Sequence, residues 1–143
     1  PENMRVPAIE LIALTKCFGN SDEPAVKSVD LSVAQGEVLA IVGGSGSGKT
    51  TTLKMINRLI EPTSGSVKVM GEDVTNVDPV GLRRSIGYAF QGVGLFPHMT
   101  VGQNVGVTLQ LLGWTKESIV ERVSELLDHS SRSRYFNNRY CIT

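Results

Sequence analysis

The chain has 143 residues, enough for one domain with its own hydrophobic core, and its 14 acidic and 14 basic side chains cancel. A balanced charge argues against a protein that is drawn to nucleic acid or an anionic membrane by long-range attraction. No apolar run approaches the ~20 residues that span a bilayer, and the isolated thiols of Cys17 and Cys141 are typical of a reducing compartment, so we expect a cytoplasmic protein.

The first part of the chain predicts strands. Residues 8–14 are mostly apolar and are followed by a turn signal at 16–20, and residues 29–33 alternate between apolar and polar side chains. Because the connection between these two strands is short, we expect them to pair in antiparallel fashion. The next apolar run, 38–42, shows no alternation, which is typical of a central parallel strand covered on both faces.

The sequence GGSGSGKT at 43–50 carries the strongest chemical signal in the chain. It fits the phosphate-binding loop (P-loop) pattern G-x-x-x-x-G-K-S/T, between the predicted strand and a predicted helix that ends at Glu61-Pro62. Backbone N–H groups of such a loop surround phosphate oxygens, and the helix N-terminus adds free donors and a positive dipole end. Lys49 would bridge the outer phosphates, and the Thr50 hydroxyl would coordinate a shared Mg²⁺. The candidate nucleotide ligands in this stretch are Gly43, Gly44, Ser45, Gly46, Ser47, Gly48, Lys49, Thr50 and Thr51.

Beyond this helix, short strands and a short helix alternate. Residues 67–69 predict a strand that ends at Gly71. Asp78-Pro79 has the residue types of a helix cap and a first helical position, so we expect a short helix there. A buried strand is predicted at 86–90.

Residues 91–99 form a loop with more apolar side chains than a solvated connection usually carries, and a helical hairpin is predicted after it. Thr100 can cap the first helix and Thr115 the second. We expect Gly102 and Gly106 to weaken the first helix. The apolar faces are Val101, Val105, Leu109 and Leu112 on the first helix and Ile119, Val120, Val123, Leu126 and Leu127 on the second.

The helical periodicity ends at Asp128. Residues 129–143 contain three arginines and no acidic residue, which leaves the preceding part of the chain net acidic. We therefore interpret 129–143 as a basic tail that is foreign to the rest of the chain, and we expect it to have no fixed structure.

Taken in this order, residues 8–128 resemble the N-terminal half of an ATP-binding-cassette (ABC) transporter ATPase subunit. The resemblance implies an α/β fold, a P-loop NTPase core of the ABC type with an N-terminal antiparallel β subdomain and the start of a helical subdomain, incomplete at the C-terminus. We expect the family sequence to stop near Asp128 through truncation or a shifted reading frame. The partial nucleotide-binding domain, 1–128, then divides into a β subdomain with the P-loop strand (8–42), a core from the P-loop to the Q-loop (43–91), and the Q-loop with the helical hairpin (92–128).

Two further sequences carry site residues over from the family. KCFG resembles the aromatic loop whose ring stacks on adenine, so Phe18 is the candidate base platform; an ordinary apolar plug at a strand end is the alternative. IGYAFQ resembles the strand and glutamine of the Q-loop, which implies that Gln91 approaches Mg²⁺ and the attacking water. The resemblance thus implies ATP and Mg²⁺ as cofactors, Lys49 and Gln91 as catalytic residues, and Thr50 and Gln91 as metal ligands.

Among ABC subunits, the sequences at 55–65 and 78–84 are most similar to importers of glycine betaine, proline, choline and related osmoprotectants. The resemblance implies a transmembrane permease subunit that docks on Gln91–Val101 and a second ATP-binding subunit in a head-to-tail dimer. It also implies a peripheral position on the inner face of the cell membrane, and we expect no nucleic-acid partner. These residues need never touch the transported solute, so they do not identify it.

Three features of the family's reaction do not occur in this sequence: the LSGGQ signature, the Walker B strand that ends in Asp-Glu, and the later switch histidine. Because phosphoryl transfer depends on such positioning groups, we expect binding of Mg-ATP without efficient hydrolysis, and catalysis by this chain stays open. Two alternatives stay open as well. One is a P-loop kinase for a small molecule, and the other is a noncatalytic nucleotide-binding module that docks on a membrane protein.

Overall fold

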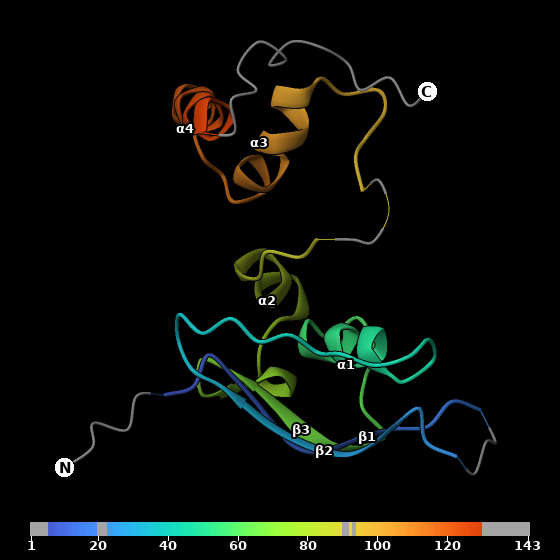
Figure 1. Cartoon of the computed structure of the whole chain (residues 1–143). Helices are drawn as coiled ribbons and strands as arrows, with labels where there is room; N and C mark the ends of the chain where they lie inside the picture. Colours follow the sequence, from blue (N-terminus) through green and yellow to red (C-terminus); the bar gives the residue numbers. More distant parts are fainter. Residues whose placement is uncertain (1–5, 20–22, 90–91, 93, 130–143) are drawn as a thin grey trace. The chain divides into compact units, whose positions relative to one another are not determined.

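The computed structural model describes residues 6–19, 23–89, 92 and 94–129 (Figure 1). The chain forms two compact units, Pro1–Ile86 and Gly87–Thr143, and each is described by itself. Across the described ranges, no helix has the length and apolar character needed to cross a lipid bilayer.

The first unit is built on a four-stranded sheet in which all neighbouring strands are antiparallel. In spatial order the strands are β2 (Val26–Val33), β1 (Ile9–Lys16), β3 (Ser64–Val69) and β4 (Glu72–Asp73). Leu11 of the central strand β1 lies opposite Leu31 on one side and Val67 on the other. The structure therefore confirms the antiparallel pairing of the first two predicted strands.

Helix α1 (Lys49–Ile56) packs against one face of this sheet (Figure 1). The 3-10 helix η1 (Val74–Asn76) and helix α2 (Pro79–Ser85) follow β4. As predicted, Asp78 caps α2, because its Oδ2 accepts a hydrogen bond from the Gly81 N–H at 2.6 Å. The buried core is apolar and consists of Leu11, Leu14, Val26, Met55, Ile56, Val67, Val74 and Leu82.

Helix α1 ends at Ile56, earlier than the predicted stop at Glu61-Pro62. Arg58 takes a left-handed φ of 52°, which a helix cannot accommodate. The Arg83 guanidinium of α2 then donates to the Arg58 carbonyl at 2.7 Å and to the Asn57 carbonyl at 3.3 Å. A side chain from α2 thus satisfies carbonyl groups at the C-terminal end of α1.

Asp73 stands where the edge strand β4 turns into η1. Its carboxylate accepts hydrogen bonds from the Thr75 hydroxyl at 2.6 Å and from the Thr75 backbone N–H at 2.8 Å. These two bonds, with smaller contributions from the cations of Lys68 and Arg58, outweigh partial burial and lower the pKa of Asp73 below its ordinary value of 3.8.

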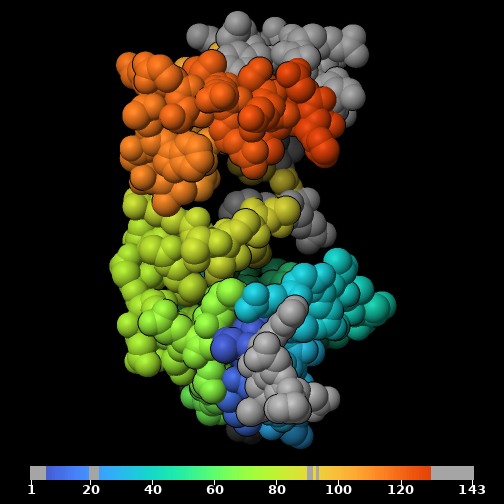
Figure 2. Space-filling model, turned by 90° about the vertical axis from the view of Figure 1, so that its left-hand side faces the viewer, coloured from blue at the N-terminus to red at the C-terminus, as the bar shows by residue number. Residues whose placement is uncertain are grey.

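Two predicted strands are not formed. Residues 38–42 are irregular, and Val38 and Val42 are 94% and 91% exposed. Figure 2 shows this part of the chain, in cyan, at the surface of its unit. Residues 86–89 are also irregular, and Phe90, the last residue of that predicted strand, lies outside the described residues.

The prediction of a central parallel strand at 38–42 was wrong, and the reason is physical. An apolar run without alternation indicates burial between two neighbours, and a parallel neighbour must be brought in by a long crossover connection. In the part of the chain that the structure describes, the only sheet is the antiparallel one, and 38–42 takes no place in it. Residues 38–42 therefore have the composition of a core strand but lack the backbone hydrogen bonds to a neighbouring strand that would make them one.

The second unit contains the predicted helical hairpin. Its helices are α3 (Val101–Leu111) and α4 (Lys116–His129). Thr100 and Gln103 form a capping box, in which the Thr100 hydroxyl accepts from the Gln103 N–H at 3.2 Å and the Gln103 side chain accepts from the Thr100 N–H at 2.8 Å.

The glycines of α3 have a packing role that the sequence pattern does not indicate. Gly102 and Gly106 are the buried residues of α3, and a Cβ added at Gly106 would lie 2.9 Å from the Ile119 Cγ2 atom of α4. The glycine thus permits a close approach of the two helices. The packing of α3 on α4 then offsets the loss of helix stability that we expect from glycine. On α4, Val123 and Leu127 are buried as predicted, whereas Val120 and Leu126 are exposed.

Candidate functional site

The P-loop is fixed to the start of β2 by Gly48. This residue is the N-cap of α1 and has a left-handed φ of 85°. A Cβ at this position would lie 2.3 Å from the Ala25 carbonyl oxygen and 3.0 Å from the Val26 Cγ2 atom. Glycine alone satisfies both the φ angle and the close approach, so the loop enters α1 at a sterically defined point.

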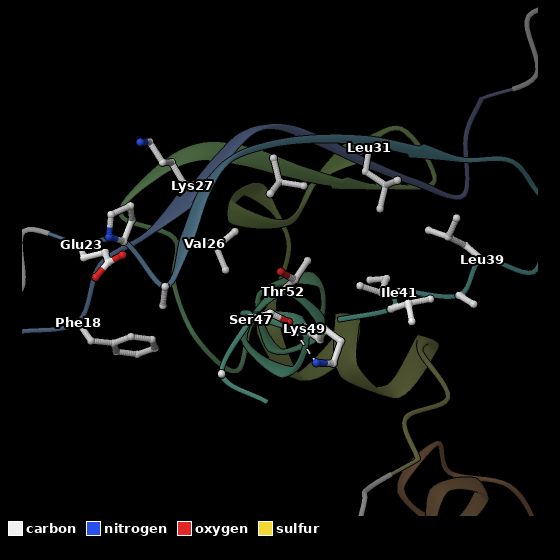
Figure 3. Close-up of a pocket in the computed structure, with 16 residues that line it drawn as sticks. Phe18, Glu23, Val26, Lys27, Leu31, Leu39, Ile41, Ser47, Lys49 and Thr52 are labelled. Carbon is white, nitrogen blue, oxygen red and sulfur yellow. Dashed lines mark hydrogen bonds between the residues drawn. The ribbon is translucent and has the colours of Figure 1, made fainter. Parts of the chain in front are cut away.

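The Lys49 ammonium is held inside the loop by the loop's own acceptors. Its Nζ donates to the carbonyl oxygens of Gly43 at 2.7 Å and Gly44 at 2.6 Å. It also donates to the Ser47 hydroxyl at 3.1 Å (Figure 3). None of these three partners carries a formal charge. The positive charge is therefore positioned by the loop and not neutralised by these contacts, which suits recognition of an anion.

Helix α1 presents its N-terminus to the same loop. Its first turn has no acidic residue, and the first N–H groups of any helix have no partner within the helix. These donors and the helix dipole favour an anion at this end. Thr50 is exposed in this turn, and its hydroxyl is the kind of hard oxygen ligand that Mg²⁺ takes together with water and phosphate oxygens. The residues of this turn fit both phosphate and Mg²⁺.

Thr52 is a site residue that sequence reasoning missed. It is buried, it lines the cleft beside the P-loop, and its hydroxyl donates to the Gly48 carbonyl at 3.0 Å. Thr52 thus ties the first turn of α1 back to its N-cap residue. The available signal was the four-residue spacing from Gly48, because threonine hydroxyls in helices bond the carbonyl four residues earlier.

Phe18 and the P-loop line one cleft with a volume of about 1010 Å³, between β2 and the segment 39–42 (Figure 3). Phe18, which is 49% exposed, lies at one end of the cleft in this view, with Ser47 and Lys49 nearer its middle. An apolar ring and a cationic loop therefore face a common space. Such a space fits a ligand with a planar aromatic end and an anionic end.

Gln91 lies outside the described residues, so its approach to a metal stays a prediction. Over 6–19, 23–89, 92 and 94–129, no group of three or more His, Cys, Asp or Glu side chains is arranged to hold a metal ion.

The loop before α3 is organised by the Asn104 side chain. Its Oδ1 accepts from the Phe96 N–H at 2.7 Å, and its Nδ2 donates to the carbonyls of Phe96 at 3.1 Å and Thr100 at 2.9 Å. The rings of Phe96 and His98 meet edge to face with centroids 6.0 Å apart. Leu95 and Phe96 nevertheless stay exposed. Between residues 94 and 100, the loop therefore has a backbone held by side-chain hydrogen bonds and exposed apolar side chains.

A scan against protein families matches residues 26–141 to the model described as "ABC transporter". The matched range contains the P-loop and the helical hairpin. It also extends beyond Asp128, the point at which we expect family sequence to stop; the origin of 129–143 stays a prediction.

Two curated relatives are similar to most of the chain. The glycine betaine/carnitine/choline transport ATP-binding protein of Bacillus subtilis is 51% identical over 116 residues, which are 81% of this chain and 30% of that protein. The osmoprotectant import ATP-binding protein of Salmonella typhimurium is 46% identical over 136 residues, which are 92% of this chain and 36% of that protein. The chain thus spans about a third of the length of these relatives.

A solved structure shares the fold. The dimeric post-hydrolysis state of an ATP-binding cassette, bound to ADP and Pi, is 30% identical and superposes with a TM-score of 0.79 over 92% of this chain and 61% of that one. The comparison confirms the predicted fold class, an ABC-type P-loop NTPase core.

Proposed function

We propose, because the chain belongs to the ABC transporter family, that it binds Mg-ATP in the cleft between Phe18 and the P-loop and serves an importer as its ATP-binding part. The observation that carries this proposal is the shared cleft, in which an aromatic ring and the Lys49-bearing loop face the same space. The adenine of ATP would stack on Phe18, and its phosphates would lie in the P-loop.

Lys49, Thr50 and the N-terminus of α1 have separate tasks in this proposal. Phosphate oxygens would replace the carbonyl and hydroxyl oxygens of Gly43, Gly44 and Ser47 as partners of the Lys49 ammonium. The N-terminus of α1 would donate N–H groups to the same phosphates. Thr50 would be one protein ligand of Mg²⁺, and Gln91 the other; the ion supplies charge neutralisation between the outer phosphates when bound.

We propose that this chain holds Mg-ATP without efficient hydrolysis. The sequence has no apolar strand that ends in Asp-Glu and no LSGGQ signature, so it offers no group of the family's type to activate water or to reach a partner's γ-phosphate. Gln91 would stand near the water in the complete site. Measurable single-turnover hydrolysis by the pure chain that disappears in Lys49→Ala would contradict this part of the proposal.

The solute class and the partners are proposed from the relatives. Their names point to an importer of glycine betaine, choline or related osmoprotectants. The importer's permease would dock on Gln91–Val101, and the exposed side chains of Leu95 and Phe96 support an apolar contact there. A second ATP-binding subunit would face this one head to tail, and the assembly would place the chain on the inner face of the cell membrane.

A test of the proposed affinity is ATP binding by the full chain, measured by calorimetry in Mg²⁺ for the wild type and for Lys49→Ala. Loss of a charge-assisted partner of the phosphates should weaken binding about 10- to 100-fold. Lys54→Ala is the matched control, because Lys54 lies in the last turn of the same helix. Equal ATP affinities for the wild type and Lys49→Ala would refute the proposal.

The same loop before α3 also supports a second candidate, a noncatalytic docking module for which ATP is only a structural ligand. Its exposed apolar side chains stand on a backbone that the Asn104 side chain holds, and Asn104 belongs to the second unit and not to the P-loop. Co-purification of a detergent-solubilised permease with Lys49→Ala at the wild-type yield would favour this candidate over the first.

A further inference from the structure

The backbone that carries Phe18 is tied to the segment that follows α1. The Cys17 N–H donates to the Thr63 hydroxyl at 3.0 Å, and the Thr63 N–H donates to the Thr15 carbonyl at 2.9 Å. These bonds join the end of β1 to the residues just before β3. The aromatic residue at one end of the cleft is therefore attached to a fixed backbone.

The Lys16 side chain belongs to the same arrangement. Its ammonium donates to the Glu61 carbonyl at 2.7 Å and stands 5.2 Å from the centroid of the Phe18 ring. This distance is within the ~6 Å at which a cation over an aromatic face is attracted to the ring's quadrupole. The bond to a main-chain carbonyl fixes a side chain that would otherwise sample many rotamers, so the cation is held over the ring.

A cation on one face of an aromatic ring has two consequences for the other face. The ammonium blocks one side, so a planar ligand has one side left on which to stack. The cation also draws electron density toward itself, which makes the opposite face a better partner for an electron-rich ring. Purines are electron-rich and planar, and they present such a surface.

We propose that Lys16 is a positioning residue for the nucleobase, which acts through the Phe18 ring and makes no contact with the nucleotide. The proposal rests on the proposed function, because it concerns the base of the bound nucleotide. Lys16 itself does not line the cleft, whereas Phe18 does. Its role is to orient the ring, to occupy one face and to strengthen stacking on the other.

This role differs from that of an ordinary cation near a phosphate site. A lysine that acts on the phosphates would change the affinity for any polyphosphate. A lysine that acts through Phe18 changes only the affinity that the base contributes. The two roles are therefore separated by comparing ATP with inorganic tripolyphosphate, which has the phosphates and no base.

The experiment measures the Kd of Mg-ATP and of Mg-tripolyphosphate by calorimetry for the full chain and for Lys16→Met. We expect Lys16→Met to weaken ATP binding about two- to fivefold, because the Phe18 ring loses the cation that orients it and strengthens stacking on its other face. The Kd of tripolyphosphate should stay at the wild-type value. Lys16→Arg, which keeps a cation over the ring, should retain most of the ATP affinity.

Two controls make the result specific. Lys27→Met removes a cation that lines the same cleft and should change both Kd values by the same factor. In a Phe18→Leu background, where no ring remains, Lys16→Met should leave the ATP Kd unchanged. Far-UV circular dichroism of each variant confirms that the fold is retained.

The proposal is overturned if Lys16→Met leaves the ATP Kd unchanged, weakens both ligands equally, or weakens ATP by the same factor without Phe18. Its failure can be told from failure of the proposed function. If ATP binding depends on Lys49 but not on Lys16, only the role of Lys16 is lost. If ATP does not bind, or binds independently of Lys49, the nucleotide site itself is refuted, and Lys16 with it.

Discussion

Strand β1 and residues 38–42 are both apolar runs in the first unit, but their surroundings are opposite. In β1, Leu14 is fully buried at 0% exposure, and the strand has β2 on one side and β3 on the other. In 38–42, Val38 is 94% exposed and the residues join no strand of the described sheet. Apolar composition therefore does not by itself decide whether a segment is a strand.

The difference lies in how each run finds a neighbour. Strand β1 pairs with β2 through a short connection and with β3 through antiparallel ladders, and both partners belong to the same unit. A central parallel strand depends on neighbours supplied by long crossovers. The segment 38–42 nevertheless borders the cleft, because Leu39 and Ile41 line it, so its irregular backbone stands next to the candidate site.

The largest effect on stability is expected when one apolar side chain in each of the two runs is replaced by alanine. Leu14→Ala should lower the free energy of unfolding by about 2–5 kcal/mol, because it leaves a cavity in a closed core. Val38→Ala should change it by about 0.5 kcal/mol or less, because that side chain is exposed. Urea unfolding of the full chain measures both. A cost for Val38→Ala near that of Leu14→Ala would show that 38–42 is buried after all.

A smaller effect is expected at Gly48, where the P-loop passes close to the residue before β2. Gly48→Ala places a Cβ 2.3 Å from the Ala25 carbonyl oxygen at a left-handed φ, so we expect a loss of about 1–3 kcal/mol and weaker ATP binding. Gly44→Ala is the control within the loop, because its Cβ would meet nothing within 4 Å. Equal stabilities and ATP affinities for the two variants would contradict the anchoring of the P-loop on β2.

The smallest effect concerns the edge of the sheet and depends on pH. Because its Thr75 hydrogen bonds lower the folded-state pKa of Asp73 below 3.8, the carboxylate stabilises the fold above that value, and the stabilisation is lost as the pH falls through the folded-state pKa. The stability difference between the wild type and Asp73→Asn should therefore narrow between about pH 5 and about pH 2 in urea titrations. A difference that stays constant over this range would remove the assigned role of Asp73.

The features that sequence reasoning recovered are those set by local chemistry. The antiparallel strands, the Asp78 cap of α2 and the helical hairpin follow from short connections, cap residues and periodicity. The P-loop sequence likewise indicated the position of α1, because Gly48 allows the turn into the helix.

The features that it missed depend on distant segments. The unpaired run at 38–42 could not be foreseen from its own residues, since pairing is decided elsewhere in the chain. The bond from the Lys16 ammonium to the Glu61 carbonyl forms only once β1 and the segment after α1 lie side by side. The packing role of Gly106 similarly requires α4 to be in place.

The central claim, that Mg-ATP binds between Phe18 and the P-loop, is tested most directly by amide hydrogen exchange on the full chain. With saturating Mg-ATP, the account predicts slower exchange at the amides of 43–51 and near Phe18. It predicts no change in β3, which lies outside the cleft. Unchanged exchange at 43–51, or protection confined to the second unit, would contradict the account.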